Sequence, residues 1–223
     1  MSAKSRPRAI LFDLDGTLLD TAPDLANALN RVRARHALPP LAFERIRPWV
    51  SHGSFALTRL GFAVADDSPE FEVLRQALLA EYHAHVADHS CLFDGMAEIF
   101  LDLTRRDLRS GIVTNKPGWL TTPLLAKLGL DRQFTCVVSG DTLTTRKPDP
   151  APLLHAAQML GVVPQDCVYI GDAERDVEAG RRAGMVTLVA LYGYLGETDT
   201  PAQWGADGYL AAPGDLVSWL NQF

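Results

Sequence analysis

The chain has 223 residues, of which 47% are hydrophobic and 22% charged, and its formal net charge is −6. This composition is typical of a globular protein with a sizeable core, while the negative charge argues against a nucleic-acid partner, which requires a basic face. No apolar run could span a membrane, and the four apolar residues before Asp13 are too few for a signal peptide. The three widely spaced cysteines read as reduced thiols of a cytoplasmic protein.

A predicted buried strand at about residues 8–13 runs directly into the sequence DLDGT at 13–17. Because strand side chains alternate, acids one residue apart point to the same side of the sheet. A bound cation or a proton-transfer task stabilises such a pair, and the following glycine lets the backbone turn and approach a bound group. The motif therefore predicts a metal-dependent site. A lone Asp-x-Asp is also compatible with a simple turn, whereas a calcium loop is excluded because Gly16 is fourth from Asp13 and not sixth.

Residues 21–88 form a strand-poor helical block. Pro23 lies near a first helical turn, and Ser68-Pro69 opens another long helix, with two shorter helices expected at about 42–49 and 53–61. Apolar residues at helical spacing mark the buried face of the second long helix: Phe71, Leu74, Leu78, Tyr82 and Val86. We expect this block to be an inserted helical domain, with hinges near 18–22 and 86–93; the alternative is extra helices packed on the sheet.

Residues 89–223 alternate strand-like runs with helical patterns. The strand candidates are 110–114, 135–138, 167–170 and 186–190, with a short one at 208–210. Between them, we expect Asp149 to cap a helix that has Pro150 in its first turn. Near-continuous apolar strands are typical of a parallel sheet covered on both faces, and the strand–helix alternation predicts a doubly wound α/β sheet. We therefore expect residues 1–20 and 89–223 to form one domain and 21–88 a second.

Ligands of open α/β sheets bind beyond the carboxyl ends of the strands. Polar residues at or just after the predicted strand ends are Asp13, Asp15, Thr114, Asn115, Lys147, Asp172 and Asp176. All are of metal-binding or phosphate-binding types. Taken singly, each also has a structural explanation, such as a helix cap or an exposed loop lysine. Their joint placement favours a functional site.

The residue types fit hydrolysis of a phosphate ester. Mg²⁺ prefers oxygen ligands, and Asp13 and Asp172 suit it. We expect Asp176 one helical turn beyond Asp172 on the same face, where it would bind the cation directly or through water. Asp13 would attack phosphorus to form an aspartyl-phosphate, and Asp15 would protonate the leaving oxygen and then deprotonate the hydrolytic water.

Further groups would stabilise the transferring phosphoryl group. Lys147 supplies a fixed positive charge, Thr114 a hydroxyl and Asn115 an amide for its oxygens.

These residues carry a resemblance to the haloacid dehalogenase superfamily of phosphatases, over essentially the whole chain. The sequence at 13–17 resembles its first motif, Thr114 its second, Lys147 its third, and residues 171–176 its fourth. The resemblance implies a Rossmann-like core, Mg²⁺ dependence and a helical type 1 cap that closes over the substrate. It also implies that Asp15 gives its backbone carbonyl to the metal.

Within this family, an acid at Asp15 indicates phosphate-ester chemistry. Segments 20–24, 114–117 and 147–150 resemble the phosphoglycolate phosphatase group. Other segments resemble a bacterial branch that includes N-acetylmuramic acid 6-phosphate phosphatase: 93–96, 192–194 and 204–207. The chain departs from many relatives at Ala173, where they have Ser or Thr.

We therefore expect a phosphatase acting on a small phosphorylated metabolite, either 2-phosphoglycolate or N-acetylmuramic acid 6-phosphate, as a monomer or homodimer. The alternatives are a sugar-phosphate mutase of the same cap type and a non-catalytic binding relative.

A small polar stretch in the helical block resembles the family's substrate-facing cap loop. It comprises Ser51, His52 and Gly53, just before a predicted helix whose N-terminal amides could meet an anionic leaving group. The alternative is an ordinary turn between helices. Arg45 and Arg47 either clamp a substrate carboxylate or are surface arginines.

Overall fold

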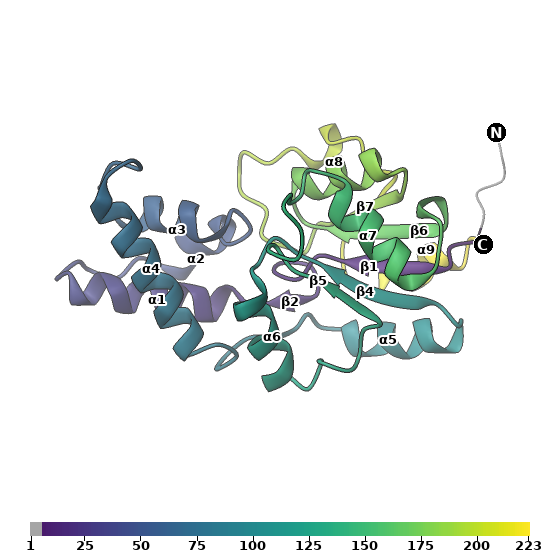
Figure 1. Ribbon diagram of the computed structural model, residues 1–223, viewed down its shortest axis with the longest axis horizontal. Helices are drawn as coiled ribbons and strands as arrows, with labels where there is room; N and C mark the ends of the chain where they lie inside the picture. The colour runs from purple at the N-terminus through teal and green to yellow at the C-terminus, as the bar shows by residue number, and fades with distance from the viewer. Residues whose placement is uncertain (1–5) are drawn as a thin grey trace.

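The computed structural model describes residues 6–223, and its centre is a six-stranded sheet (Figure 1). The strands are β1 (Ala9–Phe12), β4 (Arg109–Val113), β5 (Cys136–Val138), β6 (Cys167–Gly171), β7 (Val186–Ala190) and β8 (Gly208–Leu210). Their order is β5-β4-β1-β6-β7-β8, and every neighbouring pair is parallel. The predicted doubly wound sheet is confirmed, with no strand end displaced by more than one residue.

Helices cover both faces of the sheet. The central strand β1 carries apolar side chains on both faces, and these must be shielded from water. Ala9 and Leu11 belong to a core with α7 (Ala151–Leu160) and α8 (Glu174–Ala183). Ile10 and Phe12 point to the opposite core. That second core also receives side chains of α5 (Met96–Arg105), α6 (Gly118–Lys127) and α9 (Asp215–Leu220).

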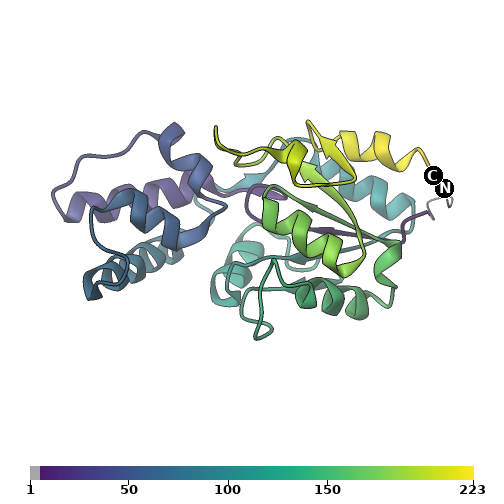
Figure 2. The same ribbon diagram turned by 90° about the horizontal axis from the view of Figure 1, so that it is seen from above.

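A group of helices, which we call the helical lobe, lies at one end of the molecule, beside the sheet (Figures 1 and 2). It comprises α1 (Ala22–Arg35), α2 (Phe43–Ile46), the 3₁₀ turn η1 (Arg47–Trp49), α3 (Gly53–Gly61) and α4 (Pro69–Ala84). Ser68 caps α4 by accepting a hydrogen bond from the Phe71 amide. The predicted apolar stripe of α4, continued by Val86 just beyond its end, is buried.

Two short strands join the helical lobe to the sheet. β2 (Leu19–Asp20) pairs antiparallel with β3 (Cys91–Leu92). Beside them the Asp24 carboxylate accepts hydrogen bonds from the amides of His89 and Ser90 and from the Ser90 hydroxyl. The two segments in which we expected hinges, 18–22 and 86–93, are therefore hydrogen-bonded to each other.

Smaller features complete the comparison with the sequence. Two further 3₁₀ turns are η2 (Pro164–Asp166) and η3 (Pro201–Gln203). We expected Asp149 to cap α7 with Pro150 in its first turn, but Pro150 occupies the cap position and Asp149 accepts from the Ala151 amide. All three cysteines are free thiols. Within residues 6–223, no helix has the length and apolar character needed to cross a membrane.

Candidate active site

Residues at the carboxyl ends of three adjacent strands meet at one edge of the sheet. Asp13 follows β1, Thr114 follows β4 and Asp172 follows β6, and all three are buried. Lys147 reaches the same place from the loop after β5, and its side chain is fully buried. The structure therefore brings the predicted residues of all four motifs together.

Three carboxylates form an acidic cluster: Asp13, Asp172 and Asp176 each offer an oxygen, and these oxygens lie within 4.8 Å of one another. Burial, with the charges of Asp13 and Asp176, raises the pKa of Asp172 to about 7. Its Oδ1 atom is buried and has no hydrogen-bond partner among residues 6–223. A carboxylate with an unused buried oxygen is suited to bind a divalent cation.

Asp176 reaches the acidic cluster by a route different from the one we predicted. We reasoned that Asp172 and Asp176 lie one turn apart on a helix face, which is wrong because Asp172 precedes α8. The first turn of α8 instead folds back toward the end of β6. The Oδ2 atom of Asp176 then accepts from the Ala173 amide at 3.1 Å.

Two glycines allow backbone to pack directly against Asp172. Gly16 has φ +82°, and a Cβ there would lie 2.1 Å from Asp172 Oδ2. A Cβ at Gly193 would lie 2.4 Å from the Cβ of Asp172. Gly16 is thus required both by its left-handed backbone and by the approach to this carboxylate.

Lys147 is the cation that balances the acidic cluster. Its Nζ atom lies 2.9 Å from Asp13 Oδ1 and 2.7 Å from Asp176 Oδ1, and it donates to the Tyr169 hydroxyl at 2.6 Å. Burial raises the pKa of Asp13 although Lys147 opposes the shift. Burial acts the same way on Asp176, but there the positive charges of Lys147 and Arg175 prevail and lower the pKa.

Asn115 holds the backbone of Lys147. Its Oδ1 accepts from the Lys147 amide at 3.1 Å, and its Nδ2 donates to the Lys147 carbonyl at 3.0 Å. We expected this amide to serve the transferring group. The contacts that it makes in the structure position Lys147, and its role toward a phosphoryl group stays a prediction.

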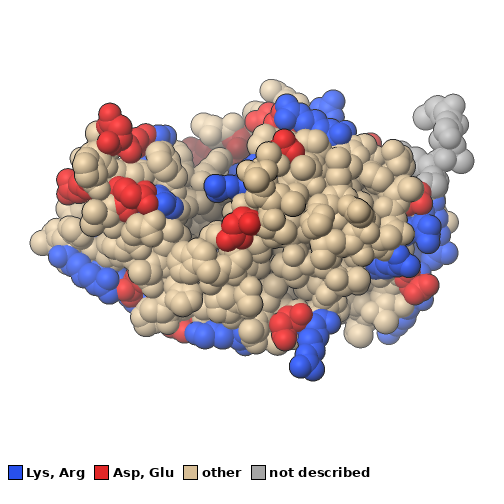
Figure 3. Space-filling view, viewed as in Figure 1, with Lys and Arg blue, Asp and Glu red and all other residues tan. Residues whose placement is uncertain are grey.

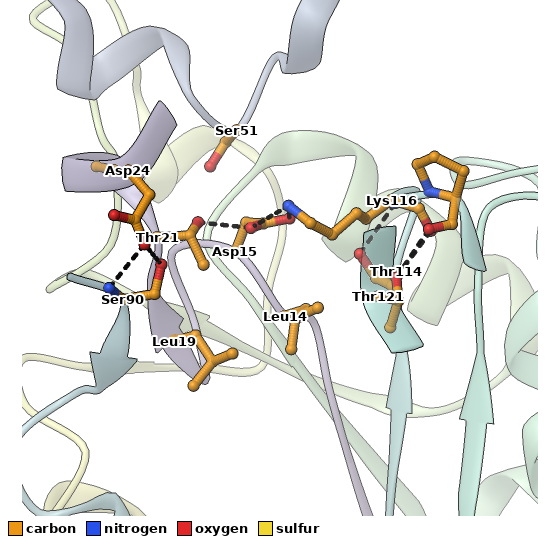
Figure 4. A network of polar contacts seen from close by, with 12 residues as sticks. Leu14, Asp15, Leu19, Thr21, Asp24, Ser51, Ser90, Thr114, Lys116 and Thr121 are labelled. Atoms are coloured by element: carbon orange, nitrogen blue, oxygen red, sulfur yellow. Dashed lines mark hydrogen bonds and ion pairs between the residues drawn. The ribbon is translucent and has the colours of Figure 1, made fainter. Parts of the chain in front are cut away.

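The Asp15 carboxylate lies apart from the acidic cluster, in a second polar network (Figure 4). It accepts from the Thr21 hydroxyl at 2.5 Å and from Lys116 Nζ at 2.9 Å. The Lys116 ammonium also lies 4.5 Å from the ring centroid of Tyr82 on α4. Sequence reasoning missed Lys116, although its place two residues after Thr114 was a usable signal.

A cavity of about 690 Å³ lies between the helical lobe and the sheet edge. Figure 3 shows a hollow here, with basic side chains near its rim. The sheet edge contributes Asp13, Asp15, Thr114, Asn115 and Lys116, and the helical lobe contributes Ser51, His52, Gly53 and Arg75. The lining also includes Arg146, Arg175, the acids Glu72 and Asp141, and several apolar side chains.

Three predicted residues stand at the loop before α3. The Ser51 hydroxyl donates to Asp172 Oδ2 at 2.6 Å, and Arg175 donates to the Ser51 carbonyl at 2.7 Å. Burial, reinforced by the Arg175 charge, lowers the pKa of His52. Gly53 has φ +79° and begins α3. The loop therefore faces the acidic cluster as well as the cavity.

The two candidate carboxylate clamps do not line the cavity. Arg47 donates to the carbonyls of Gly193 and Tyr192 at 2.9 and 3.2 Å. Arg45 is exposed. Arg47 thus ties the helical lobe to the loop after β7.

Comparison with known proteins agrees with this geometry. The family model of haloacid dehalogenase-like hydrolases matches residues 10–190. The chain is 42% identical over 219 residues to N-acetylmuramic acid 6-phosphate phosphatase of Pseudomonas aeruginosa, covering 98% of this chain and 97% of that protein. It is also 42% identical over 210 residues to phosphoglycolate phosphatase of Xanthomonas campestris, covering 94% and 95%.

A similar solved structure is that of a predicted phosphoglycolate phosphatase from Haemophilus somnus. It superposes with a TM-score of 0.84 at 26% identity, covering 97% of this chain and 99% of that one.

Proposed function

Because the chain belongs to the haloacid dehalogenase-like hydrolases and is a phosphoric monoester hydrolase, we propose that it uses Asp13 as a nucleophile and Mg²⁺ as a cofactor to hydrolyse a small phosphorylated metabolite. The observation that carries this proposal is the burial of Asp13 on the cavity floor, beside Lys147 and two further carboxylates.

The acidic cluster fits a divalent cation. Asp13, Asp172 and the backbone carbonyl of Asp15 would hold it, with Asp176 binding directly or through water. Two properties of Asp172 support this assignment: its Oδ1 atom has no hydrogen-bond partner among residues 6–223, and its pKa is raised. A bound cation would give Oδ1 a partner and would stabilise the ionised carboxylate. The bound ion would supply the positive charge that lets a carboxylate meet a phosphate dianion.

The residues then divide the chemistry among them. The Asp13 carboxylate attacks phosphorus and forms an aspartyl-phosphate, while Asp15 gives its proton to the departing ester oxygen. Water next attacks the phosphorus of this intermediate and gives a proton to Asp15. The bond between phosphorus and Asp13 breaks, so that inorganic phosphate leaves and the Asp13 carboxylate is regenerated. Lys147 and the Thr114 hydroxyl stabilise the charge on the transferring group.

The chain divides into two parts with different proposed roles. We propose that residues 21–88 form a cap and that 1–20 with 89–223 form the catalytic core. The cavity between the helical lobe and the sheet, and the paired linkers β2 and β3, support this division. Cap closure would exclude water until the ester is in line for attack.

The substrates named by the relatives, 2-phosphoglycolate and N-acetylmuramic acid 6-phosphate, are the candidates here. Both carry a carboxylate, which the basic groups of Arg75, Arg146 and Arg175 on the cavity wall could attract. The volume of about 690 Å³ favours the larger, sugar-based ester. The free thiols favour a reducing compartment such as the cytoplasm.

The test is phosphate release from both candidates, from hexose phosphates and from an aryl phosphate, with Mg²⁺ or with EDTA. We expect activity only with the cation and the highest kcat/KM for N-acetylmuramic acid 6-phosphate. Asp13→Asn should lower kcat by at least about a thousandfold, whereas the exposed control Asp131→Asn should not. Activity that survives EDTA excludes the metal assignment, and isomerisation of a hexose phosphate without phosphate release indicates a mutase.

A further inference from the structure

A residue of the helical lobe touches the acidic cluster directly. Ser51, in the loop between η1 and α3, donates its hydroxyl proton to Asp172 Oδ2 at 2.6 Å. Its carbonyl accepts from Arg175, in the first turn of α8, at 2.7 Å. Figure 4 shows the Ser51 hydroxyl directed from the helical lobe toward the sheet edge.

The two oxygens of Asp172 have different surroundings. Oδ2 accepts from the Ser51 hydroxyl and from the Tyr194 amide at 2.9 Å. Oδ1 is buried and lacks a partner among residues 6–223. The donors to Oδ2 therefore fix the rotation of the carboxylate and leave Oδ1 without a partner in the described part of the chain, free to bind a cation.

The helical lobe controls both of these donors. It supplies Ser51 itself, and its Arg47 donates to the carbonyls of Gly193 and Tyr192, next to the Tyr194 amide. The Arg47 guanidinium also lies 4.9 Å from the ring centroid of Tyr194. Movement of the helical lobe away from the sheet would break the Ser51 contact and the contacts of Arg47 with this loop.

We propose that Ser51 is a positioning residue that turns Asp172 toward the cation, so that closure of the helical lobe and cation binding strengthen each other. This inference rests on the metal-dependent function proposed above. Hydrogen bonds to a ligating carboxylate orient it, and their loss typically lowers metal affinity by about 10–100-fold. The coupling is reciprocal by thermodynamic linkage, so the cation must favour the closed position as much as closure favours the cation.

The test measures cation binding without substrate. Metal-free protein is titrated with Mn²⁺, and free Mn²⁺ is followed by electron paramagnetic resonance. Ser51→Ala should bind Mn²⁺ about 10–100-fold more weakly than the natural chain, and Ser51→Thr, which keeps the hydroxyl, should recover most of the affinity. The matched control is Ser54→Ala, because Ser54 lies in the first turn of α3 and contacts Arg75 instead of the acidic cluster.

Hydrogen exchange tests the reciprocal effect. Mn²⁺ should slow amide exchange in residues 50–54 of the natural chain and do so much less in Ser51→Ala. Equal Mn²⁺ affinity for Ser51→Ala and Ser54→Ala would overturn the inference while leaving the proposed function intact. Failure of the natural chain to bind Mn²⁺, or unchanged binding by Asp172→Asn, would overturn the metal site itself and the inference with it.

Discussion

Replacing Lys147 by Met removes a cation that is buried against the acidic cluster. Its ammonium lies 2.9 Å from Asp13 and 2.7 Å from Asp176, and its side chain is fully buried. Methionine fills a similar volume but carries no charge. Without a bound metal ion, the variant must therefore bury its carboxylates with less compensating charge, since Arg175 still interacts with them, or protonate them.

The distances set the size of the effect. At an effective dielectric constant of about 20, each contact gives a gross attraction of about 6 kcal/mol. Desolvation of the ammonium offsets most of this, and breaking a buried pair by removing one partner costs about 3–5 kcal/mol. That loss is a large fraction of the about 5–15 kcal/mol typical of a domain, so Lys147→Met should be strongly destabilised.

Urea unfolding in EDTA at about pH 7.5, followed by circular dichroism, measures this loss. The matched control is Lys127→Met, since Lys127 is an exposed lysine whose ammonium donates to the Val86 carbonyl and lies away from the acidic cluster, and it should cost less than about 1 kcal/mol. The deficit of Lys147→Met should shrink as the pH falls, because the uncompensated carboxyls become protonated. A free energy of unfolding within about 1 kcal/mol of the natural chain would refute the reasoning.

Three further predictions follow from the same geometry. Gly16→Ala should destabilise the fold by more than about 2 kcal/mol in urea unfolding, because its Cβ would lie 2.1 Å from Asp172 Oδ2 at a φ of +82°; an unaffected variant would contradict the close approach. Because the pKa of Asp172 is raised to about 7, protons should compete with Mg²⁺. The Mg²⁺ affinity measured by calorimetry should then increase with pH, by up to about tenfold per unit until about pH 7, and stay constant at higher pH. An Mg²⁺ affinity that does not change with pH would exclude Asp172 as a ligand. Iodoacetamide should label Cys91 in the folded protein but Cys136 and Cys167 only after unfolding, since burial raises the pKa values of those two thiols to about 11 and about 12; mass spectrometry that finds all three labelled in the folded state would contradict the core packing.

The sheet and the residues at its edge were predictable because their signals are local. Each strand is a short apolar run, and the polar residue that ends it, such as Asp13 or Thr114, comes next in the sequence. Parallel strands then bring those ends to one edge. The buried face of α4 was predictable for the same reason, since its spacing repeats within a single segment.

The contacts that refine the site were not predictable, because they join residues far apart in the chain. Lys116 meets Asp15 across 101 positions, and Ser51 meets Asp172 across 121. Asn115 lies at the predicted edge, but its contact with the Lys147 backbone depends on how the loop after β5 folds. Pairing of β2 with β3 likewise depends on both linkers meeting in space.

That pairing of β2 with β3 has an evolutionary consequence. The stretch between Asp20 and Cys91 departs from the α/β part and returns to it at the same point. It can be shortened, enlarged or exchanged for another helical insert without altering the order of the six strands. If this stretch is the proposed cap, selection for a new substrate can act on it while the acidic cluster stays unchanged.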